Sequence, residues 1–195
     1  MYDYLLKYII LGDENIGKST LVSSYLNNFA TEKTIAVDFQ PLCLNYDDFK
    51  IKIHLYDTSG SSTYFNIVQS YFKNIVGLIL CFDLSNKTSY DNVLIWYNAF
   101  LGKKDTYFNL ILVGLKSDLP RRVSYQEIYN LQGKLKCDYV EVNQHSPKIP
   151  EVFYKLTKNI LSDYRCNITA FQNCPGFQDN NNDFQTKTLC NCNIL

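Results

Sequence analysis

Four residues in one short segment have types and spacing suited to binding a phosphate group. Gly12, Gly17, Lys18 and Ser19 follow an apolar run at residues 4–11 and fit the pattern GxxxxGK[ST] in full. Glycines let the main chain curl so that successive N–H groups point at one anion, and a helix starting near Gly17 would add the positive end of its dipole. We expect Lys18 to hold the outer phosphates of a nucleoside triphosphate and the Ser19 hydroxyl to ligate Mg²⁺.

The elements that must position this segment alternate between short apolar runs and stretches of helical period. Runs that we interpret as strands, mostly buried on both faces, occupy residues 4–11, 51–57, 76–83 and 110–115. Residues 39–46 can form one more strand, joined to 51–57 by a hairpin and placed at the sheet edge by Pro41. Helical periods occupy residues 18–27, 88–103, 124–134 and 149–164. The alternation predicts an α/β doubly wound sheet. A strand and a helix on either side of the loop favour phosphate binding over the alternative, an ordinary turn that carries Gly-Lys by chance.

The composition fits one globular domain followed by a tail. The 195 residues are 46% hydrophobic and 19% charged, a mixture typical of a packed core. The formal net charge of +0 gives no electrostatic support for a nucleic-acid partner. We expect no secretory signal or membrane helix, free thiols for the 7 cysteines, a domain at residues 1–165 and a disordered tail at 166–195.

Further segments resemble one known family in the same order along the chain. The sequence TIAVDF at residues 34–39 resembles the first switch of Rab-family small GTPases, and LYDTSGSSTYF at 55–65 resembles their second. Residues 70–100 and ILVGLKSDL at 111–119 continue the resemblance, which covers about residues 4–165. The resemblance implies a P-loop NTPase fold of the small GTPase type, with a mostly parallel six-stranded sheet and helices on both faces.

The resemblance also implies a role for residues around the terminal phosphate. Thr34 would bring its hydroxyl to Mg²⁺ and its N–H to the γ-phosphate, Asp57 would hold Mg²⁺ through water, and the Gly60 N–H would meet the γ-phosphate. The metal ligands would therefore be Ser19, Thr34 and Asp57, and the catalytic positions Lys18, Thr34, Gly60 and Ser61. Taken alone, Asp57 could instead cap the end of a strand.

A second set of residues would recognise the base. Asp118 would accept hydrogen bonds from the ring N–H and the exocyclic amine, and guanine alone among the common bases offers both donors. The stem of Lys116 would lie over one side of the base, and Phe29 could cover the other. Alternatively, Asp118 could cap a turn and Phe29 could belong to a small core. The full predicted nucleotide site is Gly12, Asp13, Glu14, Asn15, Ile16, Gly17, Lys18, Ser19, Thr20, Phe29, Thr34, Gly60, Leu115, Lys116, Asp118, Asn143 and Gln144.

Two departures from the family pattern bear on hydrolysis. Ser61 stands where the family usually places the Gln that orients the attacking water, and serine is too short to reach the same position. Glu14 puts a carboxylate into the phosphate loop, near the expected γ-phosphate. We therefore expect slow intrinsic GTP hydrolysis, although partner proteins can supply their own catalytic Gln and Arg.

Base recognition departs from the pattern as well. The NKxD motif of the family is Leu115-Lys116-Ser117-Asp118 here, and residues 143–145 replace its SAK motif. The N–H of Gln144 could still bond the guanine carbonyl. Only 15 positions separate Ser19 from Thr34, a few fewer than usual. Since one lost polar contact weakens binding by roughly tenfold to a hundredfold, we expect reduced nucleotide affinity and fast exchange.

The final residues, TLCNCNIL, contain a pair of cysteines suited to lipid attachment. Cys192 begins a C-a-a-X sequence with Leu last, which favours geranylgeranyl, and Cys190 completes a CxC pair. Because one lipid gives only marginal membrane binding, we expect both cysteines to be prenylated. The alternatives are unmodified thiols or half of a metal site.

Three functions remain open on the sequence. The first is a Rab-like GTP/GDP switch in vesicle traffic, monomeric, using Mg²⁺, anchored by lipid to the cytoplasmic face of an intracellular membrane, with a cytosolic pool. Its partners would be effectors, exchange factors, GTPase-activating proteins and prenylation or extraction proteins, and no nucleic acid. The second is a nucleotide-binding scaffold without useful hydrolysis. The third is a P-loop kinase of a small substrate, for which the chain has few arginines, namely Arg121, Arg122 and Arg165.

Overall fold

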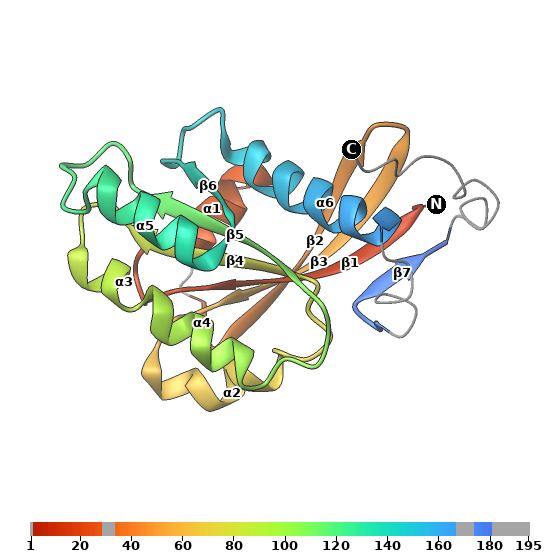
Figure 1. Ribbon diagram of the computed structural model, residues 1–195, viewed down its shortest axis with the longest axis horizontal. Coiled ribbons are helices and arrows are strands. Elements are labelled where there is room, and N and C mark those ends of the chain that lie inside the picture. The colour runs from red at the N-terminus through yellow and green to blue at the C-terminus, as the bar shows by residue number, and fades with distance from the viewer. Residues whose placement is uncertain (1, 29–33, 167–173, 181–195) are drawn as a thin grey trace, which may run out of the picture.

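A central sheet runs through the molecule and carries helices on both of its faces (Figure 1). The computed structural model describes residues 2–28, 34–166 and 174–180. The strands are β1 (Tyr4–Leu11), β2 (Val37–Tyr46), β3 (Phe49–Thr58), β4 (Gly77–Asp83), β5 (Asn109–Leu115), β6 (Asp138–Glu141) and β7 (Phe177–Asp179). The helices are α1 (Lys18–Tyr25), α2 (Phe65–Ser70), α3 (Lys87–Asp91), α4 (Val93–Leu101), α5 (Tyr125–Leu135) and α6 (Ile149–Cys166), with a 3₁₀ turn at Ser62–Tyr64.

The strand order β2-β3-β1-β4-β5-β6 puts β1 in the middle of the sheet. β1 pairs in parallel with β3 and β4, β4 with β5, and β5 with β6, whereas β2 pairs antiparallel with β3 as a hairpin. Every residue of β4 is buried, as a parallel strand covered on both faces requires. This confirms the predicted α/β fold with its mostly parallel six-strand arrangement, and the sheet gains β7 as a short addition.

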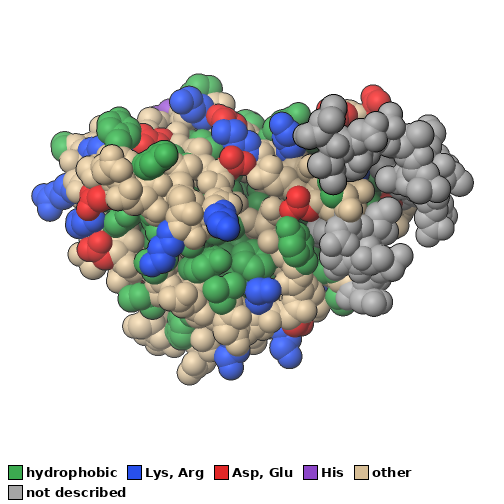
Figure 2. Space-filling view, viewed as in Figure 1, with side chains coloured by type: hydrophobic (Ala, Val, Ile, Leu, Met, Phe, Trp, Pro, Cys, Tyr) green, Lys and Arg blue, Asp and Glu red, His purple; other side chains and the backbone are tan. Residues whose placement is uncertain are grey.

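Helices from different parts of the chain bury the two faces. Leu21 and Val22 of α1 join the inner side of α6 in one core, and residues of α2, α4 and α5 form the other. α5 begins at a capping box, in which Ser124 and Glu127 bond each other's main-chain N–H groups. On the face drawn in Figure 2, basic and acidic side chains are interspersed around hydrophobic ones.

The helices are less regular than the sequence predicts. The single helix predicted at residues 88–103 is wrong, because Asn92 ends α3 and begins α4. The side chain of Asn92 is engaged elsewhere, in a hydrogen bond 2.8 Å long to Asp13. The 3₁₀ turn and α2 were not predicted, because residues 62–70 are too short a stretch for a helical period to emerge.

The prediction of a disordered tail from residue 166 is wrong for the described part of that segment. Cys166 ends α6, and β7 pairs antiparallel with Tyr4, Leu5 and Leu6 of β1. β4 pairs with β1 only from Tyr8 onward, so the first half of β1 has room for β7 on that side. Phe177 is buried against the rings of Tyr4 and Tyr164, with ring centroids 5.8 and 4.4 Å away.

Two further expectations, free thiols and the absence of a membrane helix, can be compared with the structure for the described residues. The five cysteines among them, Cys43, Cys81, Cys137, Cys166 and Cys174, are free thiols. Among the described helices, none combines the length and apolar content that crossing a bilayer requires.

We expect Phe177→Ala to lower the free energy of unfolding by about 2–3 kcal/mol, because it empties a buried ring site. The loss should not reach the upper end for phenylalanine, since β7 is a three-residue strand paired with β1 and can detach locally. Urea denaturation measures the change. The control is Gln178→Ala in the same strand, whose exposed side chain should contribute about 0.5 kcal/mol or less. Equal losses for the two variants would show that β7 does not pack as described.

Candidate functional site

The phosphate loop curls tightly where β1 ends. Gly12, Asn15 and Gly17 have φ angles of +145°, +62° and +105°, all in the region that side chains with a Cβ rarely adopt. A Cβ on Gly12 would lie 2.3 Å from the carbonyl oxygen of Cys81 in β4, so only glycine fits between the two strands there. The first turn of α1 follows at once, with Leu21 N–H donating to Gly17 O. The loop therefore has the curled main chain and the helix N-terminus that anion binding requires.

Lys18 lies under this loop and is 4% exposed. Its Nζ donates to the carbonyl oxygens of Asp13 at 2.6 Å and Ser59 at 3.4 Å. Burial lowers the pKa of the Lys18 ammonium, and the nearby carboxylates, Asp57 foremost, oppose that shift. The loop thus encloses a cation in a position that a phosphate group would neutralise.

Three oxygen-bearing side chains meet beside Lys18. Ser19 Oγ and Thr34 Oγ1 are 2.8 Å apart, and Thr34 Oγ1 donates to Asp57 Oδ2 at 3.2 Å. Asp57 is buried, and its Oδ1 has no hydrogen-bond partner among the described residues. Burial raises the pKa of the Asp57 carboxyl, against the lowering effect of the two hydroxyls and Lys18. Hydroxyl and carboxylate oxygens with one buried oxygen left over fit Mg²⁺, a hard cation that prefers oxygen ligands.

Gly60 packs directly against the phosphate loop. It has φ +71°, and a Cβ there would lie 2.3 Å from Gly12 O and 2.5 Å from Lys18 Nζ. The next residue, Ser61, directs its main-chain N–H to Ser59 Oγ at 3.4 Å, and the 3₁₀ turn follows. The main chain at Gly60 is therefore close to Lys18, while the short Ser61 side chain can contribute only a hydroxyl.

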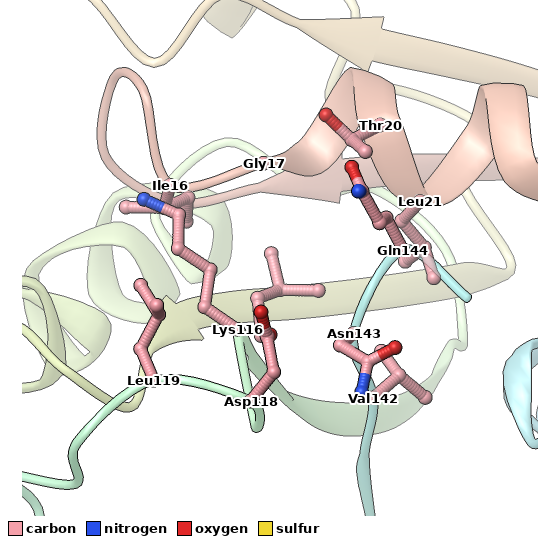
Figure 3. A pocket seen from close by; sticks show the side chains of 11 residues that line it. Ile16, Gly17, Thr20, Leu21, Lys116, Asp118, Leu119, Val142, Asn143 and Gln144 are labelled. Carbon is pink, nitrogen blue, oxygen red and sulfur yellow. The ribbon is translucent and has the colours of Figure 1, made fainter. Parts of the chain in front are cut away.

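A cavity of about 210 Å³ opens on the other side of the loop. Figure 3 shows Lys116 and Asp118, from the segment after β5, and Asn143 and Gln144, from the segment after β6, around this cavity. The lining residues are Ile16, Gly17, Thr20, Leu21, Leu115, Lys116, Asp118, Leu119, Val142, Asn143 and Gln144. Most of the residues predicted to recognise the base thus come together in one cavity.

Lys116 is held by two contacts that fix its stem at the cavity. Its Nζ donates to Asn15 O at 3.1 Å and forms an ion pair with Asp83 Oδ2 at 2.7 Å. Burial alone would raise the pKa of the Asp83 carboxyl, but bonds from Lys116 and Ser85 outweigh it and hold that pKa below its ordinary value. Asp83 stays ionised at neutral pH and orients Lys116.

Sequence reasoning missed Asp83, although the chain carries a signal for it. Asp83 is the last residue of β4, an apolar strand, so a carboxylate there stands at the same edge of the sheet as the phosphate loop. The Ser85 N–H and hydroxyl both bond its Oδ1, at 2.8 and 2.6 Å. An acidic residue at the carboxyl end of an apolar strand is therefore the sequence signal that could have identified Asp83 as part of the site.

In the altered base motif, the first position is occupied by a buried apolar side chain, that of Leu115. Leu115 is 4% exposed, and a Cβ on Gly17 would lie 4.0 Å from its Cδ1, an ordinary contact. The main-chain bond from Ser117 N–H to Val142 O, 3.2 Å long, connects the segments after β5 and β6. The side chain of Asn143 bonds the N–H of His145 at 2.9 Å, so it is engaged within its own turn.

The remaining predicted residues divide into three groups. The Asp13 carboxylate turns away from the loop and accepts hydrogen bonds from Asn92 and Trp96, so only its main chain can serve a phosphate. Glu14 is half-buried, and its charge is one of those that oppose the lowering of the Lys18 pKa by burial. Phe29, Cys190 and Cys192 lie outside the described residues.

Comparison with known proteins agrees with this geometry. A family model for the Ras family matches residues 7–162. The chain is 37% identical over 136 residues to Ras-related protein Rab-11B of Dictyostelium discoideum, covering 68% of this chain and 60% of that relative. It is 33% identical over 147 residues to Rab-11A of the same organism, covering 73% of the chain and 69% of the relative.

A third relative matches almost end to end. GTP-binding protein ypt2 of Schizosaccharomyces pombe is 29% identical over 197 residues, which cover 97% of this chain and 98% of ypt2. The Rab-11B match, by contrast, spans less than two thirds of that relative's length. With the phosphate loop, the oxygen cluster and the base cavity in the family's order along the chain, the protein belongs to the Ras family and, within it, to the Rab small GTPases.

Proposed function

We propose that this protein binds GTP and GDP with Mg²⁺, hydrolyses GTP, and acts as a molecular switch in vesicle traffic. The observation that carries the proposal is the part-buried cluster beside Lys18, in which Ser19 and Thr34 converge on buried Asp57 and one Asp57 oxygen is left without a partner among the described residues. An orphaned buried carboxylate oxygen is costly unless a ligand satisfies it. Two observations support a guanine nucleotide: the family of the chain, and its similarity to ypt2, which is named a GTP-binding protein.

The phosphate loop, the cluster beside Lys18 and Gly60 would each bind a different part of a triphosphate with its metal ion. The main-chain N–H groups of the phosphate loop and the Lys18 ammonium would bind the β- and γ-phosphates. Ser19, Thr34 and Asp57 would hold Mg²⁺, directly or through water, and the metal would neutralise charge on the outer phosphate oxygens. The N–H of Gly60 would bond the γ-phosphate, because Gly60 already lies against Gly12 and Lys18.

Loss of the γ-phosphate would then release two segments together. Thr34 and Gly60 belong to segments that meet where Ser59 N–H donates to Ala36 O at 2.9 Å. Each would be ordered partly by contacts to the γ-phosphate, so hydrolysis would loosen both. This coupling of one phosphate to two loops is how a nucleotide can switch a protein surface.

The surface next to these loops suits effector proteins. Phe39, Tyr56 and Tyr71 form a chain of rings, with centroids 5.8 and 5.3 Å apart. Ile35 and Ile67 beside the two loops are 75% and 50% exposed. Exposed apolar side chains gathered in one place on a surface mark a protein-binding site. We propose that effectors bind here and that exchange factors and GTPase-activating proteins act on the adjoining loops.

Comparing GTP with ATP tests the nucleotide. We expect the purified protein to bind GTP in the presence of Mg²⁺ and to bind ATP at least about a hundredfold more weakly, and we expect EDTA to weaken GTP binding. Asp118→Ala should weaken GTP binding by about thirtyfold to a hundredfold, because two hydrogen bonds to a charged group are lost.

The matched control is Asp91→Ala, which removes a surface acid paired with Lys87 and should leave nucleotide binding unchanged. Calorimetry measures all of these constants. Equal affinity for ATP and GTP, or GTP binding that survives EDTA and Asp118→Ala, would refute the proposed site.

We further propose that intrinsic hydrolysis is slow, because Ser61 cannot orient the attacking water as a Gln would. The change Ser61→Gln should raise the single-turnover rate of GTP hydrolysis by about tenfold or more. The control Ser62→Gln puts the same side chain one residue further along, at an exposed position, and should leave the rate unchanged. If Ser61→Gln hydrolyses GTP no faster than the unmodified protein, the missing Gln does not limit the reaction.

The tail supports a lipid anchor in the proposed membrane role. Cys190 and Cys192 fit a CxC prenylation signal, and two lipids give stable attachment where one does not. We expect the intact mass of protein isolated from eukaryotic cells to exceed the polypeptide mass by two geranylgeranyl groups. A Cys190→Ser/Cys192→Ser variant should have the unmodified mass and leave the membrane fraction. Unmodified cysteines in the natural chain would exclude the anchor.

A further inference from the structure

Trp96, the only tryptophan of the sequence, lies between the phosphate loop and the second switch segment. We propose that Trp96 is a positioning residue that couples the conformation of the second switch, through Phe65, to the phosphate loop, through Asp13, and so sets the rate at which the nucleotide leaves. The inference rests on the proposed binding of guanine nucleotides and adds a control element to it.

One end of the coupling is a hydrogen bond in the phosphate loop. Trp96 Nε1–H donates to Asp13 Oδ1 at 2.8 Å, and Asn92 Nδ2–H donates to Asp13 Oδ2, also at 2.8 Å. Both carboxylate oxygens of a loop residue are thus held by α4 and the residue before it. Charge-assisted bonds of this kind are stronger than neutral ones, so they fix the loop where Asp13 stands.

Asp13 also contacts Lys18, through its main chain. The Asp13 carbonyl oxygen accepts from Lys18 Nζ at 2.6 Å. The carbonyl that holds Lys18 and the carboxylate that accepts from Trp96 belong to the same residue, so a shift of the Asp13 side chain would turn the peptide group that holds Lys18. The geometry links the indole N–H to the cation that would bind the outer phosphates.

The other end of the coupling is an aromatic contact. The Phe65 ring meets the Trp96 indole edge to face, with centroids 5.5 Å apart. Phe65 begins α2, five positions after Gly60, which would sense the γ-phosphate. Trp96 is 7% exposed, so the indole has little freedom to absorb a movement of Phe65 without moving itself.

The break between α3 and α4 completes the arrangement. Asn92 ends one helix and begins the next, and this turn aims its amide at Asp13 while Trp96 N–H and Ile95 N–H both return to Asn92 O. Asn92 and Trp96 are four residues apart and so lie on the same side of the chain. The helix irregularity that the sequence did not predict thus has a function in this proposal.

The test measures how fast a fluorescently labelled GDP leaves four proteins: the unmodified chain, Trp96→Phe, Phe65→Leu and the double variant. Trp96→Phe keeps a ring against Phe65 but removes the N–H, and it should speed GDP release by about tenfold. If the two residues act through one coupling, the double variant should release GDP no faster than Trp96→Phe alone. Independent, multiplying effects would overturn the proposal.

Tryptophan emission gives a second readout, which a purely structural role would not move. Exchange of GDP for a non-hydrolysable GTP analogue should change Trp96 fluorescence in the unmodified protein, and Phe65→Leu should remove most of that change. Unchanged emission on exchange would contradict a contact that follows the second switch.

Phe100→Leu is the matched control, because Phe100 is a fully buried ring of the same helix and the same core whose ring contacts are with Phe72 and Phe108. It should lower the melting temperature and leave GDP release within about twofold of the unmodified rate. If Trp96→Phe does not fold, Asn92→Ala replaces it and should speed release by about threefold. Unmodified protein that binds no labelled GDP would refute the proposed function, whereas binding with unaltered release from Trp96→Phe refutes only this inference.

Discussion

The buried ammonium of Lys18 is the interaction on which the rest of the site depends. A cation that is 4% exposed must be held by fixed polar groups, and the carbonyl oxygens of Asp13 and Ser59 supply them from two segments far apart in sequence. Gly60 lies so close that a Cβ would reach 2.5 Å from Nζ. Because β1 lies next to β3 in the sheet, their carboxyl ends deliver both segments to the same cation.

Much of this arrangement could be predicted from local sequence. The strands at β1, β3, β4 and β5 follow from apolar runs, and the loop follows from glycines, a lysine and a serine at fixed spacing, since the requirements of a curled main chain are local. Leu115, Lys116 and Asp118 were also predicted to lie together with Asn143 and Gln144, and they line one cavity. Parallel strands bring their carboxyl ends to a common edge, so order along the chain was enough to place them.

The contacts that hold the site in position could not be predicted, because they join residues far apart in the chain. Asp83 fixes Lys116 across 33 positions, and Trp96 bonds Asp13 across 83. Neither pair has a spacing that a pattern could recognise. The antiparallel addition of β7 was missed for the same reason, since its three residues pair with the first half of β1 on the side that β4 does not reach. Likewise, the end of α3 at Asn92 depends on a side-chain partner in another loop.

The positions at which this chain departs from the family motifs are ones where a change of side chain has little effect on folding stability. Removing Lys18 or Asp57 would leave a buried charge uncompensated, which costs several kcal/mol. Leu115, by contrast, is a buried apolar residue where the family motif has a polar one, and such an exchange can be nearly neutral for stability. In the proposed site, polar recognition of the base would then depend chiefly on Asp118 and on Lys116, which Asp83 and Asn15 hold at the cavity. In the proposed site, the groups that would bind the phosphates are therefore the ones whose removal the fold tolerates least, whereas the groups that would recognise the base and orient the attacking water can change with less effect on stability.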